Sequence, residues 1–388
     1  MDHPYHAYRS LFPVLSTHIH LGACSGSALA IPVSGAIDEY RSALLKGCLN
    51  WETLLKKAEE AKEKFSRLIG AEKEEIAVLS SVSDAVSAIA VSLPEQPHRN
   101  QIAFTDIDFP AIGQIWLAQD RFKYNLAVIH GEDGMIRLEQ FEKQISDQTL
   151  LTCVPHVSYY NGFKQNLKDI AGIVHQKGSL LFVDAYQSAG HIPINVKDMD
   201  IDILAAGTRK YMLGIPGTAF LYIKRELSEQ FQPKMTGWFG KDKPFAFDLH
   251  HSGFAEGAKR FETGTPSFIG LYAAEAALKL LLEAAPVQIE SYLQKLARFS
   301  LQYGKEKGLQ IIGPQTVHNR TSLISIRSEQ ASLIESLLRE KNIITSSRND
   351  VIRIAPHFYN TKEEIEHTID AIAALMHGRL QSRGLPSK

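Results

Sequence analysis

The middle of the chain contains three short apolar runs that end at polar or turn residues, and this pattern constrains the fold more than any other feature. The first run, Leu180 to Val183, ends at Asp184. The second run, Ile201 to Ala206, is followed closely by Lys210, and a Gly/Pro-rich turn then leads to the third run, Thr218 to Ile223. Short apolar runs bounded by turn residues predict buried strands.

Asp184 and Lys210 follow successive strands of this prediction, so their side chains should lie at one edge of a sheet. In open α/β sheets, ligands bind at the carboxyl ends of the strands. A buried lysine can form an imine once its amine has lost its proton, and a pyridoxal cofactor needs an acid beside its ring nitrogen. The pair Asp184 and Lys210 can supply both of these groups.

Composition excludes several other classes of protein. A chain of 388 residues, 44% of them hydrophobic, can form one large domain and a smaller one. Its formal net charge of -1 provides no basic surface for nucleic acid, and no apolar run approaches the length of a membrane span. No signal peptide is visible, so a cytoplasmic location is expected. The three cysteines lack metal-ligand spacing, and we expect no metal.

Apolar runs and helical periods alternate through most of the chain. Such alternation predicts a mostly parallel sheet covered by helices on both faces. After the segment Ala284-Ala285-Pro286 the pattern changes to a smaller α+β unit, which makes this segment a reasonable domain boundary. We expect an N-terminal segment at the entrance of the site, a large cofactor-binding domain and a small C-terminal domain, at residues 1–48, 49–286 and 287–388.

The motifs around the two predicted strand ends carry a family resemblance. D-x-x-Q-S-A-G begins at Asp184, and K-Y-x-x-G-x-P-G begins at Lys210. Together they resemble the class V aminotransferase superfamily of pyridoxal-phosphate (PLP) enzymes, which includes cysteine desulfurases, selenocysteine lyases, epimerases and kynureninases. The resemblance extends over nearly the whole chain. It implies the α/β architecture of PLP fold type I and a role for Gln187 in binding the phenolic oxygen of the cofactor.

The resemblance also implies which residues bind the phosphate of the cofactor. Val82 and Ser83 open a predicted helix, whose unpaired N–H groups suit an anion, although a serine here could simply cap the helix. Thr208 and Arg209 precede the lysine, and Arg209 occupies a position where relatives contact phosphate. Trp238 belongs to a Gly-Trp segment that approaches the phosphate in kynureninases.

Other implied contacts involve the ring of the cofactor, the substrate and a second subunit. Phe109 precedes Pro110, as in kynureninases, and is expected to stack on the ring, whereas such an aromatic is otherwise usually core. Thr265 lies in the segment RFETGTP, which reaches the neighbouring subunit in relatives and so implies a homodimer. The expected substrate contacts are Gly22 and Ala23 near the carboxylate, Tyr159 beside the cofactor, and Arg353 in VIRIAPHFYNT, which binds the α-carboxylate unless it pairs with a local acid.

The type of reaction is less constrained than the cofactor. Persulfide-forming desulfurases need a cysteine on the loop before the carboxylate-binding arginine, and the segment Ile344 to Ile352 contains none. Transamination needs no further nucleophile and is favoured, with the Lys210 amine moving the Cα proton. A cysteine or selenocysteine lyase-like or kynureninase-like β-lyase is the alternative, followed by an epimerase. Lys241 replaces the histidine of kynureninases, and a non-catalytic relative of the fold is the remaining possibility.

Overall fold

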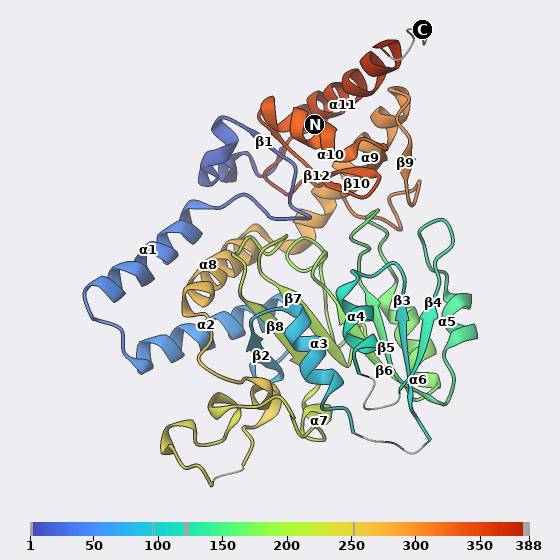
Figure 1. Cartoon of the computed structure of the whole chain (residues 1–388). Coiled ribbons are helices and arrows are strands. Elements are labelled where there is room, and N and C mark those ends of the chain that lie inside the picture. The colour runs from blue at the N-terminus through green and yellow to red at the C-terminus, as the bar shows by residue number, and fades with distance from the viewer. Residues whose placement is uncertain (1–2, 95, 97, 120–123, 251–252, 383–388) are drawn as a thin grey trace, which may run out of the picture.

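A seven-stranded sheet forms the centre of the larger part of the molecule. The computed structural model describes residues 3–94, 96, 98–119, 124–250 and 253–382 (Figure 1). The strand order is β2-β8-β7-β6-β5-β3-β4, and only β8 runs antiparallel to its neighbours. The bounds are β2 Ile76–Leu79, β3 Gln101–Thr105, β4 Asn125–Ile129, β5 Thr149–Pro155, β6 Leu180–Asp184, β7 Ile203–Gly207 and β8 Ala219–Ile223. The predicted mostly parallel sheet is confirmed.

Each face of this sheet packs against its own hydrophobic core, because successive side chains of a strand point to opposite faces. In β6, Leu181 and Val183 belong to one core and Phe182 to the other. The first core also contains residues of α2 (Trp51–Ile69), α5 (Leu138–Gln144), α6 (Leu167–Gln176) and α8 (Phe268–Ala284). The second contains residues of α3 (Val82–Ala90), α4 (Ala111–Leu117) and α7 (Arg225–Ser228). Helices therefore cover both faces, as predicted.

Helix ends follow local capping signals. The side chain of Asn50 accepts the N–H of Thr53 at 2.9 Å and starts α2, while Gly70 ends it in the left-handed conformation with φ of 69°. Ala285, with φ of 59°, separates α8 from α9 (Pro286–Glu306) where the sequence places a domain boundary.

A four-stranded antiparallel sheet, in the order β12-β13-β10-β9, forms the smaller unit drawn in orange and red in Figure 1. Its strands are β9 Ile311–Ile312, β10 Ile324–Arg327, β12 Ser346–Arg348 and β13 Val351–Ile354. The helices α9, α10 (Ala331–Glu340) and α11 (Lys362–Ser382) accompany it. The short polar strand β12 was not predicted from the sequence.

The N-terminal segment packs against this smaller unit before α1 (Ile31–Leu45) begins. Strand β1 (Ile19–His20) pairs in parallel with β11 (Ile343–Ile344), and Gly22 continues the contact in a bridge to Ala355. Arg9 forms an ion pair with Glu364 at 2.7 Å. These contacts fix the position of the chain next to Gly22 and Ala23, the residues predicted to lie at the entrance of the site.

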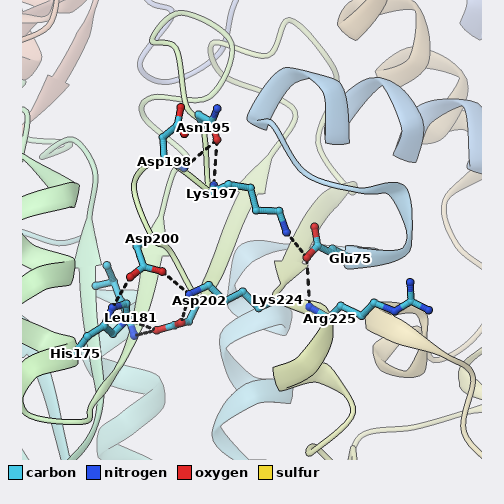
Figure 2. A network of polar contacts seen from close by, with 10 residues as sticks. All are labelled: Glu75, His175, Leu181, Asn195, Lys197, Asp198, Asp200, Asp202, Lys224 and Arg225. Atoms are coloured by element: carbon cyan, nitrogen blue, oxygen red, sulfur yellow. Dashed lines mark hydrogen bonds and ion pairs between the residues drawn. The ribbon is translucent and has the colours of Figure 1, made fainter.

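A network of charged residues occupies the amino-terminal edge of the large sheet, away from the strand ends that carry Asp184 and Lys210 (Figure 2). Asp202 accepts hydrogen bonds from the ring of His175 at 2.7 Å and the N–H of Leu181 at 2.8 Å, and pairs with Lys224 at 2.9 Å. Glu75 accepts from Lys197 at 2.5 Å and from the N–H of Arg225 at 3.3 Å. These residues bind one another and tie together the starts of β2, β6 and β7 and the end of β8. No helix in the described ranges is long and apolar enough to cross a membrane.

Candidate active site

A cavity of about 260 Å³ lies at the carboxyl ends of the parallel strands. Asp184 ends β6 and Pro155 ends β5, while Lys210 follows β7. Most of the predicted site residues line this cavity, although they come from distant parts of the chain. The lining residues are Cys24, Ser25, Ser81, Val82, Ser83, Asp108, Phe109, Ala111, Ile112, Pro155, Val157, Tyr159, Asp184, Tyr186, Gln187, Arg209, Lys210, Arg348 and Arg353.

Lys210 is partly buried beside aromatic rings. Its Nζ lies 4.0 Å from the centroid of the Tyr186 ring and 5.9 Å from that of Phe109. Burial lowers the pKa of Lys210 to about 8, although the charge of Asp184 acts to raise it. The lysine amine is therefore substantially neutral in mildly alkaline solution, which is the form that attacks a carbonyl group.

Asp184 is buried, with 8% of its surface exposed, and one of its oxygens accepts the N–H of Tyr186 at 2.8 Å. Burial raises the pKa of Asp184, whereas this hydrogen bond and the charge of Lys210 lower it. A buried acid with a free oxygen on the wall of the cavity suits a ring nitrogen that carries a proton.

Asp108 is a second buried carboxyl group in the cavity wall, and the sequence did not single it out. Its Oδ1 accepts the N–H of Phe109 at 2.6 Å, while its Oδ2 is buried with no hydrogen-bond partner in the described chain. Burial, followed by the charge of Asp184, raises the pKa of Asp108 well above its usual range. The negative charge of Asp184 thus favours the neutral form of Asp108, so the two acids influence each other's ionisation.

The amino terminus of α3 opens into the cavity through Ser81, Val82 and Ser83. Ser81 caps this helix by accepting the N–H of Asp84 at 3.0 Å. Capping by a serine and binding of an anion at the same turn are compatible. The first N–H groups of a helix have no partner within the helix and attract anions. Arg209 is exposed on the cavity wall and adds a positive charge to it.

Phe109, Tyr159 and Gln187 also reach the cavity, as the sequence predicted. Phe109 is 46% exposed and makes an edge contact with Tyr159, with the ring centroids 5.2 Å apart. An aromatic ring that remains open to this extent is unusual for core and is available for stacking on a flat ligand. The Nε2 of Gln187 donates a hydrogen bond to the carbonyl oxygen of Cys24 at 3.0 Å, which ties this side chain to the N-terminal wall of the cavity.

Arg353 is almost completely buried but has no carboxylate partner among the described residues. Its Nη1 donates to the carbonyl of Tyr159 at 2.8 Å, and its Nη2 donates to the hydroxyl of Ser346 at 2.7 Å. These neutral acceptors hold the guanidinium group in place without neutralising its charge. The alternative of an arginine paired with a local acid is not what the structure shows.

Five further residues of the predicted site do not line this cavity. The hydroxyl of Thr208 donates to the carbonyl of Ile215 at 2.6 Å and braces the turn after β7. Gly22 and Ala23 lie against Ala355, and their neighbours Cys24 and Ser25 line the cavity instead. Trp238 packs against Trp51, with the ring centroids 5.5 Å apart, and Thr265 is exposed. The contacts predicted for these five residues with the cofactor, the substrate or a second subunit stay predictions.

Metal ligands are not gathered anywhere in the described ranges, since no group of three or more His, Cys, Asp and Glu side chains has suitable geometry. His156 is buried below the cavity, and burial lowers its pKa to about 3, so the ring is neutral. Cys153 is buried in β5, where burial raises the pKa of the thiol, and Cys48 is exposed far from the lining residues.

Comparisons with known proteins identify the family and the fold of the chain. The family model of class V aminotransferases matches residues 48–368. The uncharacterized aminotransferase YcbU of Bacillus subtilis (strain 168) is 49% identical over 374 residues, which cover 96% of this chain and 99% of that protein. The kynureninase of Shouchella clausii is 26% identical over 82% of this chain and 78% of that protein. The apo structure of a cysteine desulfurase from Thermococcus onnurineus NA1 superposes with a TM-score of 0.86 at 26% identity, over 97% of this chain and 99% of that one.

The chain therefore belongs to the class V aminotransferase family and has the architecture of PLP fold type I. It is an enzyme of the PLP-dependent transferases and lyases, and its cofactor is pyridoxal phosphate. The residues of the cavity fit this group: they include a lysine of lowered pKa, a buried acid pair with an unpartnered oxygen, and a helix amino terminus beside an arginine.

Proposed function

We propose that this enzyme catalyses the transamination of an α-amino acid, with Lys210 as its acid–base residue. One observation carries the proposal: Lys210 and Asp184 lie at the ends of neighbouring strands and face one cavity that also contains Arg353, which has no carboxylate partner among the described residues. A lysine, an acid and an unpaired arginine are the groups needed to hold an aldehyde cofactor, its ring nitrogen and a substrate carboxylate.

Different residues of the cavity would contact different parts of the cofactor, namely its ring nitrogen, its phosphate and the face of its ring. Asp184 would hold the proton of the ring nitrogen, and the neighbouring Asp108 would share the remaining proton of the acid pair. Val82, Ser83 and Arg209 would bind the phosphate, and Phe109 would pack on the ring. When bound, pyridoxal phosphate withdraws electrons from the Cα atom of an amino acid. The protein residues supply position and protons.

Arg353 would bind the α-carboxylate of the substrate. Its guanidinium group is held by Tyr159 and Ser346, so little side-chain freedom is lost on binding. The absence of an acid partner in the described chain leaves its charge available to an incoming carboxylate. A planar two-pronged donor also fixes the orientation of the substrate relative to Lys210.

Transamination is favoured because Lys210 is the group in the cavity best suited to move a proton at neutral to mildly alkaline pH. Moving a proton from Cα to the cofactor requires one such base. The histidine that desulfurases carry at the stacking position is replaced by Phe109, which exchanges no proton with a leaving group. Phe109 therefore supplies no acid at that position for departure of a Cβ substituent.

Cleavage at Cβ is the second candidate, and the position of Cys24 favours it. Cys24 is buried at 1% exposure on the cavity wall, and its electrostatic influence reaches Lys210. A thiol in this place could assist departure of sulfur from a substrate. Its depth and its place outside the segment from Ile344 to Ile352 argue against the mobile, accessible thiolate that a desulfurase needs.

A homodimer with shared sites is part of the proposal. Thr265 is exposed and does not line the cavity of its own chain, which agrees with a contact to the cofactor phosphate of a second copy. Trp51, Phe245 and Phe247 lie in an aromatic cluster with Trp238, and Phe247 is 79% exposed. Exposed aromatic side chains of this kind mark protein interfaces.

Spectral screening tests the reaction class. The purified holoprotein is mixed with individual amino acids, and the change in its visible absorption is followed while keto acids, pyruvate, ammonia and sulfide are assayed. Keto acid formed together with an amino-acid product from an added keto acceptor supports transamination. Pyruvate with ammonia, or free sulfide from cysteine, contradicts it and supports cleavage at Cβ.

A further inference from the structure

Arg348 is a cationic residue of the cavity that neither the cofactor nor the α-carboxylate requires. The cavity wall contains three arginines. Arg209 lies next to Lys210 and is assigned to the phosphate, and Arg353 is assigned to the α-carboxylate. Arg348 comes from the adjacent strand β12 and is exposed.

The strand register places Arg348 on the same face of the small sheet as Arg353. Strands β12 and β13 are antiparallel, with Ser346 opposite Arg353 and Arg348 opposite Val351. Opposed residues share a face, and side chains alternate along each strand, so Arg348 and Arg353 are diagonal neighbours. Diagonal neighbours are separated by roughly 7–8 Å, which is within reach of one ligand that carries two anionic groups.

The acid nearest to Arg348 in sequence is already engaged elsewhere. Asp350 accepts the hydroxyl of Tyr160 at 2.5 Å and pairs with Arg327 at 2.6 Å. Arg348 itself donates only to the carbonyl of Ser347, at 2.8 Å. Within the described ranges no carboxylate lies at ion-pair distance from Arg348.

Positive charge in this part of the cavity is therefore uncompensated. The two acids of the cavity wall, Asp108 and Asp184, are buried beside each other and are committed to the cofactor end. Both Arg353 and Arg348 lie close enough to Lys210 to contribute to its lowered pKa. A substrate with one carboxylate would neutralise one guanidinium group and leave the other without a counter-ion.

We propose that Arg348 binds a second anionic group, so that the substrate is an α-amino acid whose side chain ends in a carboxylate or another oxyanion. The inference rests on the proposed function for the role of Arg353. The α-carboxylate would occupy Arg353 and the side-chain anion would occupy Arg348. This arrangement selects acidic amino acids over their amides of the same shape, because an amide gains no charge-assisted hydrogen bond.

Calorimetric binding tests the second anion site without turnover. Glutarate and butyrate are titrated into the holoprotein and into the variants Arg348→Gln and Arg298→Gln. Arg298 is an exposed arginine of α9 outside the cavity and controls for the loss of one charge. We expect glutarate to bind about tenfold or more tighter than butyrate in the wild type and Arg298→Gln, and the difference to vanish in Arg348→Gln. Equal binding in the wild type, or an unchanged preference in Arg348→Gln, would overturn the proposal.

Kinetics separate this inference from the reaction class. With glutamate, aspartate and cysteate, Arg348→Gln should raise KM about tenfold to hundredfold with little change in kcat, whereas values for glutamine and asparagine should stay the same. Faster turnover of neutral amino acids with no effect of Arg348→Gln would refute the acidic substrate and leave transamination standing. A preserved glutarate preference without any turnover would support the anion site and refute the proposed reaction. Visible absorption of the bound cofactor checks that the variant site is intact.

Discussion

The Nζ of Lys210 lies 4.0 Å from the centroid of the Tyr186 ring, and both residues line the cavity. This contact joins the strand end of β6 to the turn after β7. Two groups that lie 24 residues apart in sequence are thus brought together by adjacent strands. The ring of Tyr186 limits the positions that the lysine amine can adopt, and the cavity wall supplies its electrostatic environment.

Covalent attachment of the cofactor should depend on the ionisation of Lys210. The neutral amine is the reactive form, and its pKa is lowered to about 8, so the rate at which apo-protein combines with pyridoxal phosphate should rise through pH 8 and then level off. Asp184→Asn removes the charge that raises this pKa and should shift the midpoint to lower pH. Stopped-flow absorbance measures the rate. Borohydride reduction and mass spectrometry should find no adduct in Lys210→Ala; an adduct on another lysine would contradict the assignment.

The acid pair should respond unequally to removal of charge. Asp108 is the member whose pKa burial and Asp184 raise furthest, so it is expected to be protonated at neutral pH. Asp108→Asn resembles a protonated acid and should retain the cofactor, with a melting temperature close to that of the wild type. Asp184→Asn should lower turnover by several orders of magnitude, because the proton on the ring nitrogen loses its partner. Equal losses in both variants would show that Asp108 must carry a negative charge.

Gly207 allows the ring of Tyr186 to lie where it does. A Cβ atom at Gly207 would approach this ring to 2.5 Å, so Gly207→Ala should push the ring towards Lys210. We expect weaker cofactor retention and an altered visible spectrum, measured by dialysis and absorbance. Gly172→Ala is the matched control, since nothing lies within 4 Å of its added Cβ in α6. The control should be neutral or stabilised by about 0.5–1 kcal/mol, as is usual for glycine to alanine inside a helix.

The network in Figure 2 should make stability depend on pH through His175. The hydrogen bond to Asp202 raises the pKa of His175, and burial acts against it. A raised pKa stabilises the fold fully below the unfolded value of about 6.5, and this contribution disappears as pH rises through the folded value. His175→Gln should therefore lose roughly 0.5–1 kcal/mol at pH 5.5 and less at pH 9, by urea unfolding. His318→Gln, at an exposed loop position, serves as the control; an equal loss at both pH values would contradict the assignment.

Dimerisation should be required for firm cofactor binding. Sedimentation of the holoprotein is expected to show a dimer, and Thr265→Ala should weaken cofactor retention by a few-fold to tenfold, or about 1 kcal/mol for one hydrogen bond. Retention is measured by equilibrium dialysis. Thr17→Ala, an exposed position in the N-terminal segment, should leave it unchanged. A fully active monomer would refute the shared site.

The sequence was most informative where local pattern and position in the sheet agree. The strand ends at Asp184 and Lys210 could be predicted because both residues follow short runs of apolar residues. The mostly parallel sheet followed from the alternation of strands and helices. These features depend on interactions that are local in sequence or on general rules of chain connection.

Other parts of the site depend on contacts that no local pattern reveals. Asp108 follows β3 and resembles any acid at a strand end in the sequence, whereas in the fold it lines the same cavity as Asp184 and its pKa is raised by the charge of Asp184. Arg348 belongs to a strand of only three polar residues, for which apolar periodicity gives no signal. Cys24 and Ser25 line the cavity instead of the predicted Gly22 and Ala23, because the bridge from Gly22 to Ala355 fixes the direction of the chain.

The pairing of β1 with β11 has a consequence for the order in which the molecule is completed. Ile19 is synthesised well before its partner Ile343, because most of the described chain lies between them. The wall formed by Cys24 and Ser25 can close only after the chain up to Ile343 has left the ribosome, and contacts between such distant segments form slowly. During synthesis the lysine and its acid partner stand at an open sheet edge, and enclosure of the cofactor is a late event of folding.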